Sequence, residues 1–295
     1  MEGAEYMREG PILIEGTIKT ADETDLSVTW CEPASVPRAL VVMVHGFSSH
    51  SGLYADTTNW LVEQGFSVAT FDCRGHGKSE GRRGYVRRFS DYREDLALVV
   101  KASRDRHPAL PWVLFAHSQG ATIAIDYTLN DSERPNALVL LCPFLEVALK
   151  VPTYKLALSK ILNHAWPTLA LSNEIDPAEA TRVTAAQERI ASDPLVHHVA
   201  TARWFAEVTA CQTRIQNNAR SLSVPSWLGV AGNDRIVRTD TSLAFARSVG
   251  DTMTVAIYPE AFHELLLDPV TPQVHADIAT WMGAQLFSSY NSGRS

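Results

Sequence analysis

The sequence predicts an α/β fold with a mostly parallel central sheet, flanked by helices and interrupted by a helical insertion. Three observations predict this fold: short apolar segments, helical patterns between them, and one long stretch where the alternation stops. The apolar segments are rich in β-branched residues and lie at residues 39–44, 66–71, 112–116, 137–141, 226–230 and 254–258. Continuous apolar runs of this length are typical of parallel strands that are covered on both faces. Their alternation with helices implies right-handed crossovers between strands.

Helical patterns separate the expected strands. The segment 56–64 ends before Gly65, a residue that suits the C-terminus of a helix. Asp91, with Glu94 three residues on, predicts a capping box at the start of a second helix. Near the end of the chain, Pro272 fits the first turn of a helix with an apolar stripe.

The alternation stops after residue 142 and resumes near Val224. The intervening stretch has no clear strand pattern, and the short amphipathic segments 154–162 and 199–212 predict helices within it. We therefore expect a core that is discontinuous in sequence. Its expected parts are the first part of the core at 1–142, a helical cap at 143–217 and the second part of the core at 218–295.

Composition narrows the function classes. The chain carries 26 basic and 33 acidic residues, a formal net charge of −7, which disfavours general nucleic-acid binding. No apolar stretch of about 18 residues predicts a membrane-spanning helix, and residues 1–10 lack the apolar core of a signal peptide. The four cysteines lie at positions 31, 73, 142 and 211, with no metal-binding spacing, and we expect reduced buried thiols in a cytoplasmic protein.

The strongest local motif surrounds Ser118. The expected strand 112–116 runs directly into it, and a helical pattern follows. Small residues stand two positions before and after the serine, at Ala116 and Gly120, as a strained nucleophile elbow requires. An ordinary serine in a strand-to-helix loop is the alternative, since such five-residue patterns recur by chance.

A second motif follows the strand 39–44, where His45 and Gly46 precede Phe47. In enzymes with a nucleophile elbow, a loop after an earlier strand supplies one backbone N–H of the oxyanion hole, and the residue after the serine supplies the other. We therefore expect the N–H groups of Phe47 and Gln119 to stabilise an oxyanion. We interpret His45 as a structural residue that bonds within its own loop.

A serine nucleophile needs a base and an orienting carboxylate, which follow it in the order acid, then histidine. Asp234 stands at the end of the strand 226–230, and His263 follows the strand 254–258. The other histidines considered, at positions 197, 198 and 275, do not follow strands. The same argument disfavours the aspartates at positions 240, 251 and 268. We predict Ser118, His263 and Asp234 as the catalytic residues.

Two motifs resemble nucleotide sites and fail. The Gly-Lys-Ser run at 77–79 has Asp72 where a P-loop requires glycine, and Gly75 with Gly77 is followed by Glu80 where the dinucleotide motif requires glycine. We therefore expect no cofactor and no metal. The arginines at positions 82, 83, 87 and 88 are interpreted as a solvated face.

These residues together resemble the α/β-hydrolase superfamily, in the branch of monoacylglycerol lipases and lysophospholipases, also described as serine aminopeptidase-like hydrolases. The resemblance is carried by residues 45–54, 71–86, the elbow around Ser118, and the two blocks 232–237 and 262–264. It implies the same triad and oxyanion hole, together with a helical cap between two core strands. Alanine at Ala116 and Ala121 departs from the glycine that is common in relatives.

The predicted function is hydrolysis of carboxylic esters with a medium or long acyl chain, of the monoacylglycerol or lysophospholipid type. Apolar residues are frequent at 145–171 of the expected cap, where they could line an acyl tunnel, pack the cap or contact a membrane surface. The alternatives are a peptidase or aryl-ester hydrolase with the same triad, and a non-catalytic binding protein. A peptidase would need a carboxylate for the substrate amine, with candidates at Glu146, Glu174, Glu179, Glu188 and Glu207.

Overall fold

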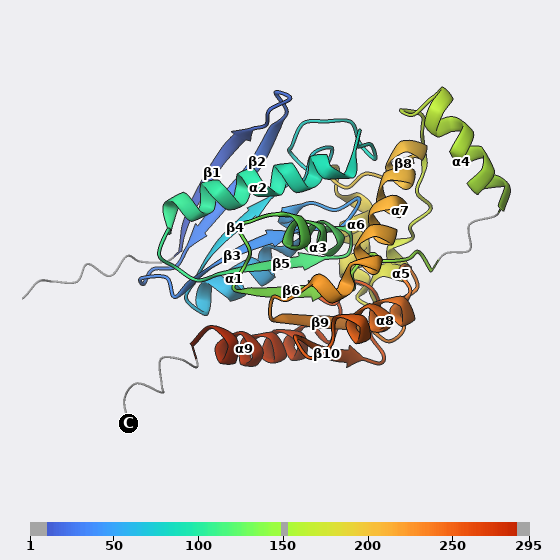
Figure 1. Ribbon diagram of the computed structural model, residues 1–295. Helices are drawn as coiled ribbons and strands as arrows, with labels where there is room; N and C mark the ends of the chain where they lie inside the picture. Colours follow the sequence, from blue (N-terminus) through green and yellow to red (C-terminus); the bar gives the residue numbers. More distant parts are fainter. Residues whose placement is uncertain (1–10, 149–152, 288–295) are drawn as a thin grey trace, which may run out of the picture.

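The computed structural model describes residues 11–148 and 153–287, which form an α/β fold around one central sheet (Figure 1). The segment 1–10, for which no signal peptide was predicted, lies outside these residues. The sheet has eight strands in the order β1-β2-β4-β3-β5-β6-β9-β10. The strands are β1 (Ile12–Lys19), β2 (Asp25–Glu32), β3 (Ala39–Val44), β4 (Phe66–Phe71), β5 (Trp112–His117), β6 (Ala137–Leu141), β9 (Ser226–Ala231) and β10 (Met253–Tyr258).

The predicted fold class is confirmed. All six expected strands are present, and the strands from β4 to β10 in the sheet order pair in parallel. Every residue of β3, β4, β5, β6 and β9 is buried, which explains their continuous apolar sequences.

The antiparallel strands β1 and β2, at one edge of the sheet, were not predicted. Strand β1 alternates between half-buried and exposed residues along its whole length. Its sequence, ILIEGTIK, is partly polar and contains Gly16, so it lacks the continuous apolar run by which the other strands were identified.

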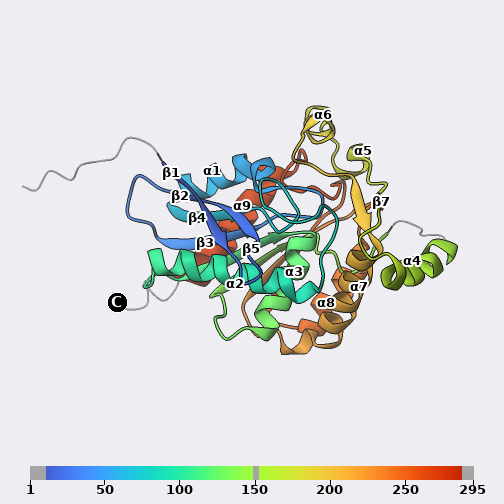
Figure 2. The ribbon, with the colours of Figure 1, turned by 90° about the horizontal axis from the view of Figure 1, so that it is seen from above.

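The helices cover both faces of the sheet (Figure 1, Figure 2). On one face lie α1 (Ala55–Glu63) and α9 (Thr271–Phe287), where the ring of Trp60 stacks on His275 with centroids 4.0 Å apart. On the other lie α2 (Phe89–Arg106) and α3 (Gln119–Asn130), and α8 (Thr239–Val249) packs beside β9 and β10. Pro272 is in the first turn of α9, as predicted.

The predicted start of α2 is wrong by three residues. Asp91 is the third residue of the helix and not its cap, because α2 already begins at Phe89. A carboxylate oxygen of Asp91 accepts a hydrogen bond from the backbone N–H of Arg88 at 3.2 Å. The carboxylate therefore stabilises the helix start from inside the first turn.

The chain between β6 and β9 forms the insertion, which lies over the carboxyl ends of the central strands (Figure 1). Its elements are α4 (Thr153–Ala165), β7 (Ala170–Ser172), α5 (Pro177–Ala180), α6 (Thr184–Ser192), β8 (Val199–Thr201) and α7 (Ala202–Asn217). Elsewhere, a 3₁₀ turn at Ser51–Tyr54 precedes α1, and another at Ala219–Ser221 follows α7. The division into core and cap domains stays a prediction. Within the described residues, no helix has the length and apolar character needed to cross a membrane.

The expectation that the insertion contains no strand is wrong. Strands β7 and β8 pair in antiparallel fashion, but each has only three residues, too few to produce a visible alternation. The expected helix over 199–212 begins later, at Ala202. The hydroxyl of Thr201 accepts a hydrogen bond from the N–H of Trp204 at 3.2 Å and caps α7.

Asp126 of α3 joins the insertion to the core and supplies a stability prediction. Its carboxylate is fully buried and accepts hydrogen bonds from Arg93 of α2 at 3.3 Å and Arg214 of α7 at 2.9 Å. We expect Asp126→Ala to lower the free energy of unfolding by about 1–3 kcal/mol, because both guanidinium groups lose a buried acceptor. Asp105→Ala, which removes an exposed pair with Lys101, is the control and should cost less than about 0.5 kcal/mol in urea unfolding. Equal losses would contradict the buried contact.

Candidate active site

Ser118 lies in the turn between β5 and α3 with φ 53° and ψ −121°, a backbone conformation that a residue with a Cβ rarely adopts. The turn holds this strain through its hydrogen bonds. The N–H of Ser118 donates to the carbonyl of Leu141 at 2.9 Å, and its own carbonyl accepts from Ala121 at 3.0 Å and Phe144 at 3.1 Å. Backbone strain of this kind costs about 1–3 kcal/mol and is concentrated at functional sites.

The small residues around Ser118 are required by the packing of the turn. A Cβ on Gly120 would lie 2.3 Å from the carbonyl oxygen of Val44, which is backbone and cannot move aside. A Cβ on Gly46 would lie 3.1 Å from the Cβ of Ser118. The loop after β3 therefore packs directly against the turn, as the two sequence motifs together require.

The structure brings the three predicted side chains together. The Nε2 atom of His263 lies 2.9 Å from the Oγ atom of Ser118. Its Nδ1 atom lies 2.7 Å from a carboxylate oxygen of Asp234. The other oxygen of Asp234 accepts hydrogen bonds from the N–H groups of Ile236 and Val237, each at 2.9 Å. The three groups come from the ends of β5, β9 and β10, where open α/β sheets place their sites.

Burial and charge act against each other in this group. Burial disfavours a charged imidazole, but the carboxylate of Asp234 outweighs it and raises the pKa of His263 above its usual 6.5. Burial also disfavours the charge of Asp234, yet the imidazole and the two backbone N–H groups lower the pKa of that carboxyl. The arrangement therefore favours an ionised Asp234 that stabilises a protonated His263.

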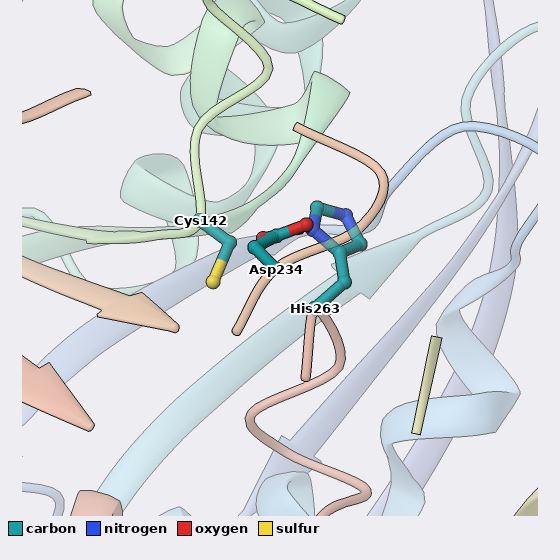
Figure 3. A group of neighbouring side chains, drawn as sticks. All are labelled: Cys142, Asp234 and His263. Atoms are coloured by element: carbon teal, nitrogen blue, oxygen red, sulfur yellow. Dashed lines mark hydrogen bonds and ion pairs between the residues drawn. The ribbon is translucent and has the colours of Figure 1, made fainter. Parts of the chain in front are cut away.

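Cys142, at the end of β6, faces the same pair (Figure 3). The Sγ atom of Cys142, a carboxylate oxygen of Asp234 and a ring nitrogen of His263 all lie within 4.8 Å of one another. Burial, and then the charge of Asp234, raise the pKa of the Cys142 thiol well above its usual value, so the thiol stays protonated. All four cysteines are buried and free, as predicted, but the sequence did not predict that one of them lies beside the acid.

The competing residues lie elsewhere. His275 of α9 stacks on Trp60 of α1. The carboxylate of Asp268 pairs with the guanidinium of Arg182 at 2.6 Å. Asp240 pairs with Arg238 on the surface. The remaining competitors are Asp251, which is exposed, His197, which packs against Phe47, and His198, which lines the cavity described below.

The predicted oxyanion donors flank Ser118. Gln119 is the first residue of α3, and Phe47 follows Gly46 in the loop after β3. Neither backbone N–H has a hydrogen-bond partner among the described residues. His45 has the structural role that we expected. It donates from Nδ1 to the carbonyl of Gly46 at 2.7 Å and accepts at Nε2 from the N–H of Cys73 at 2.9 Å.

A buried network behind His263 was not predicted. His117 donates from Nε2 to the carbonyl of His263 at 3.2 Å. The hydroxyl of Tyr54 lies between the Nδ1 atom of His117, at 3.0 Å, and a carboxylate oxygen of Glu264, at 3.1 Å. The sequence holds one signal of this network, because His117 and Glu264 directly adjoin the predicted serine and histidine.

A cavity of about 560 Å³ opens over Ser118 and His263, between the core and the insertion. Most of its lining is apolar. The apolar residues from the insertion are Phe144, Val147, Leu162, Leu171, Ile175, Pro177, Ala180, Ile190, Val196, Ala200, Ala202, Trp204 and Phe205, and those from the core include Phe47, Leu53 and Ile236. Val147, Leu162 and Leu171 belong to the segment that we expected to supply apolar residues to a tunnel. One of the five glutamates considered for a peptidase, Glu174, lies in the cavity wall. Glu264, which was not among those five, lies there as well.

A serine in a strained turn after β5, with an acid and a histidine at the ends of later strands, defines the α/β-hydrolase fold. The profile of the family described as "Serine aminopeptidase, S33" matches residues 35–270, and the chain belongs to this family. The chain is 30% identical over 270 residues to the human monoglyceride lipase, covering 89% of this chain and 88% of the human protein.

Two further relatives extend the comparison. The crystal structure of the Paleococcus ferrophilus monoacylglycerol lipase matches with a TM-score of 0.78 and 28% identity, covering 93% of this chain and 99% of that one. An uncharacterised abhydrolase domain-containing protein of Dictyostelium discoideum is 27% identical over 94% of this chain, which spans only 30% of that longer protein. The resemblance to the monoacylglycerol lipase branch is confirmed, and the chain is a carboxylic ester hydrolase.

The raised pKa of His263 predicts the pH dependence of the rate. A general base must be neutral, so kcat/KM should fall as the pH drops through a pKa above 6.5. Asp234→Asn removes the charge that raises this pKa, and should move the acid limb to lower pH while kcat drops by about 10⁴. Asp240→Asn, on the nearby surface, should leave the limb in place. A flat profile between about pH 5 and 8 would exclude a histidine base.

Proposed function

We propose that this chain hydrolyses lipid esters of the monoacylglycerol or lysophospholipid type through an acyl-enzyme on Ser118. The observation that carries the proposal is the hydrogen bond of 2.9 Å between Ser118 and His263 at the floor of an apolar cavity. A nucleophile that touches its base is the geometry required for covalent catalysis. An apolar cavity above it suits the acyl chain of a lipid ester.

In the proposed mechanism, the Oγ atom of Ser118 attacks the ester carbonyl carbon while its proton passes to Nε2 of His263. The N–H groups of Phe47 and Gln119 stabilise the oxyanion. The carbon–oxygen bond to the leaving alcohol then breaks, and His263 returns the proton to that oxygen. Water, deprotonated by His263, next attacks the acyl-enzyme. The bond between the acyl carbon and Oγ then breaks, and His263 returns the proton to Oγ, which releases the fatty acid and free Ser118. Asp234 keeps the imidazole in the correct tautomer throughout.

The mainly apolar wall of the cavity supports a lipid substrate over a peptide. The wall contains the carboxylates of Glu174 and Glu264, and Glu264 already accepts a hydrogen bond from the Tyr54 hydroxyl. The rest of the wall is mainly apolar. The relatives named monoglyceride lipase agree with this preference. Three exposed apolar side chains of the insertion, at Ile161, Trp166 and Leu171, support the predicted contact of this region with a lipid surface.

The serine supplies the first test. We expect Ser118→Ala to abolish turnover of monoacylglycerols and nitrophenyl esters, because no other group replaces the attacking hydroxyl. Ser248→Ala, which changes an exposed serine of α8, is the matched control and should retain the wild-type rate. Near-normal hydrolysis by Ser118→Ala would reject the proposed nucleophile.

The apolar cavity supplies the second test. Each buried methylene contributes about 0.8 kcal/mol, so kcat/KM should rise about fourfold per methylene from acetyl esters until the chain fills the cavity. The measurement is a series of nitrophenyl and glycerol esters of increasing chain length, with amino-acid amides beside them. A preference for acetyl esters would contradict the lipid assignment, and faster cleavage of the amides would favour a peptidase.

A further inference from the structure

We propose that Trp204, in the first turn of α7, is a positioning residue that holds both oxyanion donors of the hydrolase. The inference rests on the proposed function, since it assigns a task to the same oxyanion hole. Trp204 comes from the insertion, whereas Phe47 and Gln119 come from two separate segments of the core. Its indole contacts the side chains of both residues.

The first contact is a ring stack. The rings of Trp204 and Phe47 lie with centroids 3.8 Å apart and planes only 19° from parallel. Phe144, at the end of β6, lies nearly parallel to the same indole at 6.1 Å. Trp204 itself is 5% exposed. The indole thus fixes the ring of Phe47 against a buried part of the protein.

The second contact is a hydrogen bond. The indole N–H of Trp204 donates to the Oε1 atom of Gln119 at 2.6 Å, and the Gln119 side chain is fully buried. The Gln119 side chain also has a polar contact with Tyr92 of α2, although no hydrogen bond of normal geometry reaches its Nε2 atom within the described residues. The bond to Trp204 is therefore the short hydrogen bond that anchors the Oε1 end of this side chain. Tryptophan combines a large stacking surface with a ring N–H donor.

The loop of Phe47 depends on the insertion at other points too. Ser48 has φ 64°, an unfavourable conformation for a serine. The Nδ2 atom of Asn173 donates to the Ser48 hydroxyl at 2.6 Å, and the N–H of His197 donates to the Ser48 carbonyl at 3.2 Å. The loop that carries Phe47 is thus held by contacts from the insertion, and Trp204 also reaches the side chain of Gln119, the residue that carries the second donor.

This arrangement has a kinetic consequence. Oxyanion donors act only when they point at the oxygen as charge develops, and removal of one costs about 10²–10³ in kcat. A residue that aims both donors should affect kcat far more than KM. A residue that merely contacts the acyl chain would instead affect long esters more than short ones.

The test uses Trp204→Phe, which keeps a stacking ring and removes the N–H, and Trp204→Leu, which removes both. Trp60→Phe changes a tryptophan of α1 that stacks on His275 of α9, and is the matched control. The full chain is assayed for kcat and KM with acetyl and octanoyl nitrophenyl esters. Affinity for phenylboronic acid, which forms a tetrahedral adduct with a nucleophilic serine, and the melting temperature are measured in parallel.

We expect kcat to fall about tenfold in Trp204→Phe and about a hundredfold in Trp204→Leu, by the same factor for both esters. KM and the melting temperature of Trp204→Phe should stay near the wild-type values, and its affinity for the boronic acid should fall with kcat. Trp60→Phe should match the wild type. If Trp204→Leu does not fold, Trp204→Phe decides the question.

A double-mutant cycle tests the hydrogen bond itself. Gln119→Met keeps the backbone N–H and the side-chain length but removes the acceptor. Combined with Trp204→Phe, it should lower kcat no further than the more damaging single change, because both remove one bond. Fully additive losses would contradict the anchoring role.

The remaining outcomes separate this inference from the proposed function. A wild-type chain that hydrolyses esters, with variants of undiminished kcat, would overturn the role of Trp204 alone. A loss confined to the octanoyl ester would overturn it as well, and would make Trp204 an acyl-chain contact. A wild-type chain that hydrolyses neither ester and does not bind the boronic acid would overturn the proposed function and this inference together.

Discussion

The strained turn at Ser118 is the constraint on which the rest of the site depends. Its positive φ bends the chain sharply between β5 and α3, so the side chain of Ser118 projects from the end of the strand. The same bend brings Gly120 against the carbonyl of Val44, where no side chain fits. It also leaves the N–H of Gln119 at the start of a helix, where an anion is favoured. One local conformation thus positions both the hydroxyl and one proposed oxyanion donor.

The polar groups around this turn are buried, and their burial explains the form of the site. A carboxylate away from water needs donors, and Asp234 has two backbone N–H groups as well as His263. His263 is held in turn through its carbonyl by His117, which Tyr54 contacts. Because these hydrogen bonds hold Asp234 and His263 from separate segments, the two side chains are in position before any substrate arrives. Such preorganisation is the main source of electrostatic stabilisation in enzymes.

The sequence predicted those features that depend on residues close together in the chain. Continuous burial on both faces gave β3, β4, β5, β6 and β9 an unmistakable apolar pattern, and small residues around Ser118 marked the turn. Strand ends then selected Asp234 and His263 as candidates. The edge strand β1 was not predicted, because half of its residues are exposed and it therefore lacks a continuous apolar run. Strands β7 and β8 were not predicted, because three residues are too few to show an alternation of apolar and polar residues.

The contacts between distant segments could not be predicted. Nothing in the sequence links Trp204 to Gln119, which are 85 residues apart, or Tyr54 to Glu264, which are 210 apart. Cys142 carries no sign that it faces Asp234. These pairs arise from the way the insertion and the strand ends pack together, which depends on the whole fold. The structure was therefore needed to identify the residues from other elements that contact the predicted site.

The central claim is that the hydroxyl of Ser118 is activated by His263. The most direct measurement is labelling of the intact chain with a fluorophosphonate, followed by mass spectrometry of its peptides. The account predicts a single stoichiometric adduct on Ser118, lost after denaturation and nearly lost in His263→Ala. An adduct on a different serine, or labelling of Ser118 that is equally fast without the imidazole, would contradict it.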